Sequence, residues 1–272
     1  MPALYVVATP VGNLEDITLR AIRILKEVKL IAAEDTRKTR KLLSSYDIKT
    51  PTTSYHEHNK LIKLDYILNC LEHEDVALVS DAGMPGISDP GYELISSVIH
   101  HNIPIVPVPG PSALLSALVV SGLPTDTFVY LGFLPHKAGD RRRLLKLRAS
   151  EKSTLVIFES PHRLIESLQD MLTILGDRQI SVSRELTKIY EEIFRGILSQ
   201  AVEHFTSPRG EFTLVVAGQA EESGNGIDIK DVEKRLRQMR ESGMAAKASI
   251  AQLSGDTGLA RKTLYQTWIK MK

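Results

Sequence analysis

The sequence predicts an α/β protein that ends in a short all-helical region. Short, continuous apolar runs alternate with segments in which apolar residues recur at helical spacing, a pattern typical of βαβ units and a largely parallel sheet. A second series of apolar runs follows a stop at Gly122–Pro124, and the chain after residue 228 shows helical patterns only. We therefore expect two α/β domains and a small helical domain.

The first α/β domain is expected to cover residues 1–122. Its buried strands are expected at 3–8, 29–33, 75–80 and 103–108, with helices between them at 18–28, 59–72 and 91–99. Another helix is expected to open near Ser112, after a Pro/Gly turn, and to end before Gly122–Pro124. That stop is a natural hinge to the next domain.

The second α/β domain is expected to cover residues 123–220. Strands are expected at 127–133, 153–158, 179–186, 188–196 and 211–218, and helices at 139–150, 162–175 and 197–206. Two of these strands follow one another with no helix between them, so the sheet should be mixed rather than fully parallel.

The C-terminal domain, residues 227–272, follows a polar linker at 220–228. We expect a helix that ends at Gly243, a short helix, a turn around Gly255–Gly258 and a last helix from about Ala260. This order resembles a helix-turn-helix, in which residues near the start of the last helix face outward; a packing cap is the alternative. The outward residues would be Arg261, Lys262, Thr263 and Tyr265.

Composition indicates an ordinary globular protein of a reducing compartment. The single cysteine, Cys70, cannot form a disulfide within the chain, and it falls on a helical pattern where a buried thiol is commoner than a nucleophile. No apolar run approaches the roughly 20 residues that span a bilayer, and the N-terminal residues have no basic signal-peptide region. We expect a cytoplasmic protein.

Charge is unevenly distributed along the chain. Residues 230–272 contain ten Lys or Arg and four Asp or Glu, although the net charge of the whole chain is only +1. A second basic run extends from Lys137 to Arg148. Either these runs bind a polyanion, or they are solvated helix faces.

Three loops follow strands of the first domain and are rich in Gly, Pro, Asp and Ser. They are "TPVGNLEDIT" (9–18), "SDAGMPGISDPG" (80–91) and "VPGPSA" (108–113). Because the carboxyl ends of parallel strands meet at one edge of a sheet, the loops should converge on one crevice. The phosphate-binding patterns GxxxxGK[ST] and GxGxxG are absent, so a ligand with a ribose and no phosphate, such as S-adenosylmethionine, suits them.

These motifs resemble those of the bacterial rRNA small subunit methyltransferase I family, within the tetrapyrrole methylase superfamily. The resemblance also rests on "AAEDTR", "GFLP", "ESPHR", "RELTK" and "GEFTLVV", and so runs nearly end to end. It implies the tetrapyrrole methylase (class III methyltransferase) fold, with the cofactor in a cleft between two α/β domains. It also implies 2′-O-methylation of a decoding-centre cytidine (cytidine 1402) in 16S rRNA, with S-adenosylmethionine as the methyl donor. A homodimer, no metal, and the small ribosomal subunit as substrate are further implications.

The resemblance also implies the residues of the cofactor cleft. They are Pro10, Asp81, Gly83, Met84, Ile87, Ser112 and Ala113 from the first domain, and Phe133, Phe158, Phe212 and Thr213 from the second. Met84 stands where many members of the family have threonine, so a hydroxyl contact would be missing there.

Catalysis of methyl transfer to a ribose hydroxyl depends on positioning and on removal of the hydroxyl proton. The residues that "AEDTR", "FESPHR" and "RELTK" offer for this role are Asp35, Arg37, Glu159, Glu185 and Lys188. Asp35 is also a candidate helix cap, and Glu185 with Lys188 a candidate ion pair. The "YHEH" stretch at 55–58 suggests a metal site at first sight, but the reaction needs no metal, and a polar or RNA-facing loop is the preferred interpretation.

Basic residues of the chain are expected to contact RNA phosphates, which position RNA without reading its sequence. They are Arg37, Lys38, Arg40, Arg141, Arg142, Arg143, Arg163, Arg261 and Lys262. Tyr55, Phe133 or His136 could stack on a base, and the sequence does not choose among them. Two alternatives remain, a tetrapyrrole methylase and a ligand-sensing DNA-binding regulator, and the basic runs argue against the first of these.

Overall fold

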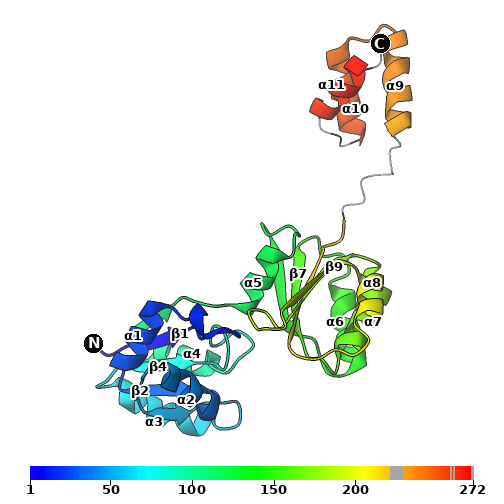
Figure 1. Cartoon of the computed structure of the whole chain (residues 1–272). Helices are drawn as coiled ribbons and strands as arrows, with labels where there is room; N and C mark the ends of the chain where they lie inside the picture. Colours follow the sequence, from blue (N-terminus) through cyan, green and yellow to red (C-terminus); the bar gives the residue numbers. More distant parts are fainter. Residues whose placement is uncertain (221–228, 258, 260, 271–272) are drawn as a thin grey trace. The chain divides into compact units, whose positions relative to one another are not determined.

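The computed structural model describes residues 1–220, 229–257, 259 and 261–270. The chain forms two compact units, Met1–Gly218 and Gln219–Lys272, which are considered separately. The first contains two five-stranded sheets, and the second is helical (Figure 1).

The first sheet is fully parallel, with the strand order β3-β2-β4-β1-β5. Its strands are β1 (Leu4–Val7), β2 (Leu30–Ala33), β3 (Thr52–Ser54), β4 (Val76–Val79) and β5 (Ile105–Val108). Four of them confirm the predicted strands. The prediction missed β3, because this three-residue edge strand is polar and carries no apolar run.

Helices cover both faces of this sheet. They are α1 (Leu19–Glu27) and α2 (Thr36–Ser45) on one face, and α3 (Lys60–Leu71) and α4 (Tyr92–His100) on the other. Alternate residues of β1 separate the two cores, since Val7 packs with α1 and α2, whereas Leu4 and Val6 pack with α3 and α4. A short 3-10 helix, Leu14–Asp16, precedes α1.

The second sheet has the strand order β6-β7-β10-β8-β9. Its strands are β6 (Phe128–Phe133), β7 (Thr154–Glu159), β8 (Gln179–Arg184), β9 (Glu192–Ile197) and β10 (Phe212–Val216). Only β6 and β7 pair in parallel, and β8 and β9 form an antiparallel pair. The mixed sheet that the direct strand-to-strand step predicted is therefore confirmed.

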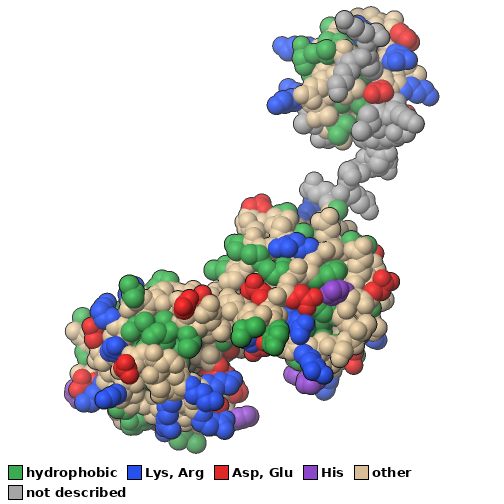
Figure 2. Space-filling model, in the orientation of Figure 1, with side chains coloured by type: hydrophobic (Ala, Val, Ile, Leu, Met, Phe, Trp, Pro, Cys, Tyr) green, Lys and Arg blue, Asp and Glu red, His purple; other side chains and the backbone are tan. Residues whose placement is uncertain are grey.

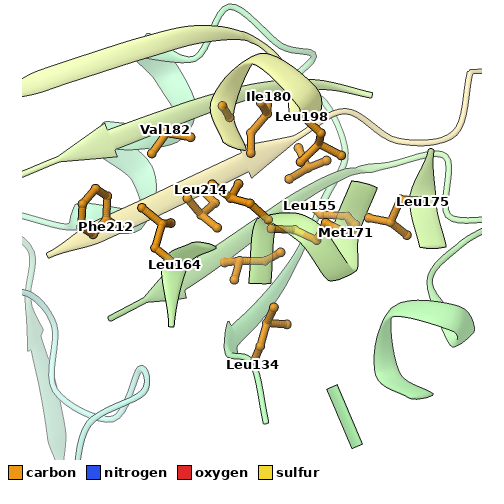
Figure 3. Packing of buried hydrophobic residues seen from close by; sticks show 14 of the residues in the cluster. Leu134, Leu155, Leu164, Met171, Leu175, Ile180, Val182, Leu198, Phe212 and Leu214 are labelled. Carbon is orange, nitrogen blue, oxygen red and sulfur yellow. The ribbon is translucent and has the colours of Figure 1, made fainter. Parts of the chain in front are cut away.

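Three helices pack on one face of the second sheet and form the largest core of the unit (Figure 3). They are α6 (Ala138–Leu147), α7 (Leu164–Leu175) and α8 (Leu198–His204). The opposite face is covered by α5 (Ala113–Val120), whose Leu114, Ala117 and Leu118 pack against Val156 and Val215. Helix α5 thus follows β5 of the first sheet in the chain but packs on the second sheet. It does so although it precedes the expected domain boundary at residue 122.

The C-terminal unit contains α9 (Ile229–Glu241), α10 (Ala246–Thr257) and α11 (Arg261–Lys270) around its own apolar core. Because α10 continues through Thr257, Gly255 is helical, and the prediction of a turn beginning there is wrong. Gly258, Ala260 and the linker residues 221–228 lie outside the described residues. No helix in the described ranges is long and apolar enough to cross a membrane.

Arg141 corrects one prediction made from the basic run. Its side chain is 2% exposed, and its guanidinium donates to Asp170 Oδ2 at 2.6 Å and to Glu166 Oε2 at 3.3 Å. Burial alone would raise the pKa of Asp170, but hydrogen bonds from Arg142 and Arg141 hold that pKa below its ordinary value. Arg141 therefore joins α6 to α7 inside the protein and is not a phosphate contact.

We predict that Asp170→Ala lowers the free energy of unfolding by about 3–5 kcal/mol, because Arg141 would lose its closest carboxylate while buried. Arg142→Gln should cost less than about 1 kcal/mol, since Arg142 is exposed. Urea denaturation at pH 7 measures both, and equal losses would contradict this interpretation. The contribution of the pair should be complete above the ordinary aspartate pKa and disappear as the pH falls through the lower folded pKa.

Candidate functional site

A pocket of about 330 Å³ lies where loops of the first sheet meet strand ends of the second. A volume of this size falls in the range of small-molecule sites. Its walls come from the loop after β1, the loop after β4, the first turn of α5, and residues of β6, β7 and β10. The lining residues are Val11, Ala82, Gly83, Met84, Ile87, Asp89, Ser112, Ala113, Leu114, Phe133, Phe158, Glu159, Ser160, Pro161, Glu211, Phe212 and Thr213.

The loop after β4 is held against the loop after β1. Thr9 and Gly83 exchange two backbone hydrogen bonds of 2.9 Å, and the Thr9 hydroxyl donates to the Ser80 carbonyl at 3.1 Å. These bonds satisfy backbone groups that would otherwise be left unpaired near a pocket. They also place Gly83 and Met84 on the pocket wall.

The same loop turns sharply before α4. Ser88 has φ +61° and Gly91 has φ +150°, and a side chain at Gly91 would meet Leu78 Cδ2 at 3.1 Å and the Gly86 amide nitrogen at 3.2 Å. Gly91 is therefore required both by its backbone conformation and by the close approach of the chain. The turn directs Ile87 and Asp89 toward the pocket.

Aromatic side chains form the wall contributed by the second sheet. Phe158 makes edge contacts with Phe133 and Tyr130, with ring centroids 5.7 Å and 5.2 Å apart. The Tyr130 hydroxyl lies 2.6 Å from the Ser88 hydroxyl, so a hydrogen bond joins β6 to the loop after β4. The first-sheet loop and the aromatic wall are thus linked directly.

The pocket brings together most of the residues that the resemblance implied for the cofactor. Nine of them line it: Gly83, Met84, Ile87, Ser112, Ala113, Phe133, Phe158, Phe212 and Thr213. Ser112 also caps α5, as expected, by accepting from the Leu115 amide at 3.4 Å. Pro10 and Asp81 are not among the lining residues.

Asp81 lies beside α2 instead of in the pocket wall. Its Oδ1 accepts from the Asp35 amide at 3.1 Å, and its Oδ2 accepts from Lys38 Nζ at 2.7 Å. The Asp81 amide in turn donates to Glu34 Oε2 at 3.2 Å. Asp81 therefore ties the ends of β2 and β4 together.

Asp89, which the sequence analysis did not select, supplies a carboxyl group to the pocket wall. Burial and the negative charge of Glu34 raise its pKa to about 7, against a hydrogen bond from Ser80 that lowers it. The loop contains two Ser-Asp pairs, Ser80–Asp81 and Ser88–Asp89, and spacing alone does not distinguish them. Of the two aspartates, only Asp89 lines the pocket.

Glu159 lines the pocket but is fully occupied by other contacts. Its side chain is buried, and its two oxygens accept from Arg163 Nη2 at 2.6 Å, the Ser160 amide at 2.7 Å and the Ser167 hydroxyl at 2.6 Å. Arg163 also donates to the Leu134 carbonyl at 2.7 Å, and its side chain is only 13% exposed. Arg163 is therefore a structural residue, and the expectation that it contacts phosphate is corrected.

The "RELTK" turn places an ion-pair cluster beside the pocket. Lys188 Nζ lies 2.8 Å from Glu185 Oε1 and 2.8 Å from Glu211 Oε2, and Glu211 is a lining residue. Burial opposes the charge of Lys188, but both carboxylates raise its pKa above the ordinary value. Lys188 is consequently a cation at neutral pH and not a base.

The backbone of this turn is strained. Glu185 has φ +50° and Thr187 has φ +66°, and the second value is unusual for a β-branched residue. Gly12, in the loop after β1, packs so closely on the turn that an added Cβ would lie 2.3 Å from Lys188 Cγ. Such strain is common at functional sites.

Asp35 and Arg37 form a cap on α2 outside the pocket. The Asp35 carboxylate accepts from the Arg37 amide at 2.8 Å, and Arg37 Nη2 reaches Asp35 Oδ2 at 2.8 Å. The hydrogen bond from the Arg37 side chain holds the pKa of Asp35 well below its usual range. The capping interpretation of Asp35 is confirmed.

Several of the expected RNA-binding residues lie on the surface. Figure 2 shows Lys and Arg side chains beside the hollow between the two halves of the first unit. The exposed members of the predicted set are Arg37, Lys38, Arg40, Arg142 and Arg143 in this unit, and Arg261 and Lys262 in the C-terminal unit. Among the three aromatic candidates, Tyr55 is buried and cannot stack on a base, whereas Phe133 and His136 are exposed.

The pocket fits a cofactor that is part apolar and part cationic. Aromatic and aliphatic side chains surround most of it, and Asp89 adds a carboxyl group that makes no ion pair with a Lys, Arg or His of the described ranges. No group of three or more potential metal ligands occurs in the described part of the chain, and this holds for the region of His56, Glu57 and His58. S-adenosylmethionine matches this combination of surfaces.

Comparison with known proteins places the chain in a family. The model of the tetrapyrrole (corrin/porphyrin) methylases matches residues 3–202. A ribosomal RNA small subunit methyltransferase I from Halalkalibacterium halodurans is 46% identical over 97% of this chain and 94% of its own length. A protein of the same name from Thermotoga maritima is 50% identical, over 80% of this chain and 100% of its own length.

Solved structures show the same fold. A uroporphyrin III C-methyl transferase from Thermus thermophilus superposes with a TM-score of 0.56 at 20% identity, covering 79% of this chain and 97% of that protein. A structure of the Thermus enzyme complexed with S-adenosylhomocysteine gives a TM-score of 0.58 over the same shares. The two-sheet fold, the extent of the family match and the identity to full-length relatives agree: the chain belongs to the ribosomal RNA small subunit methyltransferase I family of the tetrapyrrole methylases.

Proposed function

We propose that this protein transfers a methyl group from S-adenosylmethionine to the 2′-hydroxyl of a decoding-centre cytidine, cytidine 1402, of 16S rRNA. Similarity over nearly the full chain to proteins named ribosomal RNA small subunit methyltransferase I carries the proposal. The proposed substrate is the rRNA within the small ribosomal subunit, the proposed active form is a homodimer, and the compartment is the cytoplasm.

The pocket supports binding of the methyl donor. Phe133, Phe158 and Phe212 offer apolar surface for an adenosine group, and the loop after β4 adds the Asp89 carboxyl group to the same pocket. Enclosure of this kind excludes water from the reacting atoms and fixes their orientation, which is the main requirement of an in-line displacement. The cofactor supplies the activated methyl group.

Lys188 is the proposed cation for the acceptor side of the reaction. It lies next to the pocket, is held from two sides by Glu185 and Glu211, and stays protonated at neutral pH. A fixed cation can stabilise negative charge that develops on a ribose oxygen or can hold a neighbouring phosphate. Glu185 is then a positioning residue, and Glu159 keeps the Ser160–Pro161 wall in place through its hydrogen bonds.

Exposed basic residues are the proposed phosphate contacts. Arg40 and Arg143 make no ion pair with a carboxylate among the described residues, so their guanidinium groups are available to RNA. Arg261 and Lys262, at the start of α11, are the proposed contacts of the C-terminal unit. These contacts would position the substrate without reading its base sequence.

We predict that purified small subunits, incubated with labelled S-adenosylmethionine, acquire label at a ribose 2′-hydroxyl. Phe133→Ala should raise the Kd for the donor roughly three- to tenfold, because half-exposed Phe133 would no longer cover it. Phe128→Ala, on the same strand but outside the pocket, is the matched control. Free 16S rRNA and a uroporphyrinogen serve as alternative acceptors. Label on the tetrapyrrole alone would refute the proposed acceptor.

The phosphate contacts predict a change in salt dependence. Arg40→Gln and Arg143→Gln should each weaken rRNA binding and reduce the slope of log affinity against log salt by roughly one. Binding of S-adenosylmethionine should stay at the wild-type value. Arg20→Gln, an exposed arginine on α1, is the control, and an equal effect of this variant would assign the change to net charge alone.

The C-terminal unit should be dispensable for chemistry. The Thermotoga relative matches 80% of this chain over its entire length, and Met1–Gly218 makes up that same share. A protein truncated after Gly218 should bind S-adenosylmethionine with unchanged affinity and keep its kcat, while its KM for the rRNA substrate rises. Loss of all activity in a folded truncation, judged by circular dichroism, would show instead that the unit belongs to the active site.

A further inference from the structure

We propose that Asp89, the lining carboxyl group without an ion-pair partner among the described residues, is the counter-ion of the cationic part of S-adenosylmethionine. This inference rests on the proposed function, because the ligand is the methyl donor named there. It assigns a role to a residue that neither the motifs nor the family resemblance selected.

The pocket wall contains three carboxyl groups, and two of them are already neutralised. Glu159 is paired with Arg163 at 2.6 Å, and Glu211 is paired with Lys188 at 2.8 Å. Asp89 makes no ion pair with any Lys, Arg or His that the structure describes. It is the lining carboxyl group whose charge is left for a ligand to balance.

The surroundings of Asp89 make this charge costly in the free protein. From the strand ends, Glu34 and Asp81 add negative charge, and Lys38, a cation beside them, is bound to Asp81 at 2.7 Å. From β6, the phenol of Tyr130 faces the same carboxyl group and hydrogen-bonds to Ser88. The Ser80 hydroxyl is the one neighbour in this set that favours the ionised form.

A cation in the pocket reverses this balance. Burial and the neighbouring carboxylates raise the pKa of Asp89 to about 7, so near neutral pH a substantial share of free protein carries the protonated, neutral form. S-adenosylmethionine has a sulfonium and an ammonium group, and either one stabilises the carboxylate. Binding therefore breaks the O–H bond of Asp89 and releases the proton to solvent.

The sign of the pH dependence follows from this exchange. Below pH 7 the cofactor must displace a proton, so its Kd should fall by up to about tenfold for each pH unit gained. Above pH 7 the carboxylate is already ionised and the Kd should level off. Folding responds in the opposite direction: because the folded pKa of Asp89 lies above the unfolded one, the contribution of this group to stability falls as the pH rises from about 4 through 7.

Isothermal titration calorimetry on the full chain, between pH 5.5 and 8.5, tests the proposal. The ligands are S-adenosylmethionine, S-adenosylhomocysteine, which lacks the sulfonium charge, and 5′-methylthioadenosine, which lacks both positive charges. The variants are Asp89→Asn, the charge-keeping Asp89→Glu, and Asp126→Asn as a control that removes an exposed carboxylate outside the pocket. Repeating one pH in two buffers of different ionisation enthalpy counts the protons released.

Asp89→Asn should bind S-adenosylmethionine at least about tenfold more weakly than wild type at pH 8 and should show no dependence on pH. It should also release no proton and be more stable to heat at pH 8 than wild type. Asp89→Glu should retain the pH dependence, and Asp126→Asn should match wild type. A loss shared by S-adenosylhomocysteine assigns the ammonium as the partner, and a loss confined to S-adenosylmethionine assigns the sulfonium; both support the proposal.

Unchanged affinity and an unchanged pH profile in Asp89→Asn would overturn the proposal. If that variant also lost kcat, Asp89 would act instead as acceptor of the substrate proton. The same pH dependence with 5′-methylthioadenosine would also overturn it, since that ligand has no positive charge at these pH values. Wild-type protein that binds the donor in this way but methylates no rRNA would refute the proposed function and leave the role of Asp89 standing.

Discussion

The packing of helix α5 on the second sheet is the constraint on which the pocket depends. Ser112 caps the helix at the end of the loop after β5, and Leu114, Ala117 and Leu118 are buried against Val156 and Val215. One end of α5 is thereby fixed to the first sheet and its side is fixed to the second. The loops of one sheet and the aromatic wall of the other can then face each other across about 330 Å³.

Pairing of buried charges separates the structural groups from those that face a ligand. Arg141 with Asp170, and Arg163 with Glu159, form ion pairs enclosed within the protein. Such pairs hold elements in register because breaking one leaves an uncompensated charge in a poorly polarisable interior. Lys188 and Asp89 differ from them, since one lies at the edge of the pocket and the other on its wall. The two charged side chains that face a ligand are therefore a cation, Lys188, and a carboxyl group, Asp89.

The two units differ in what they contain. The first unit contains the pocket and its whole lining, and its fold is the one shared with the uroporphyrin methyltransferases. The second unit has its own core, built from Val232, Leu236, Ile250, Leu253 and Leu264, and exposes basic residues on α11. The pocket therefore lies wholly in the first unit, and the second unit folds around a core of its own.

The sequence by itself determined the fold class and nearly all strands and helices, and its resemblance to a known family implied nine lining residues of the pocket. The elements are local or periodic features: apolar runs mark buried strands, Ser112 and Asp35 mark helix starts, and loops after parallel strands meet at one edge. Only the tertiary structure decided which charged side chains are free. Asp81 and Asp89 each follow a serine, and Arg141 and Arg143 lie in one basic run, yet Asp81 is paired with Lys38 and Arg141 with Asp170. Burial and partners come from residues distant in the chain, and no local pattern encodes them.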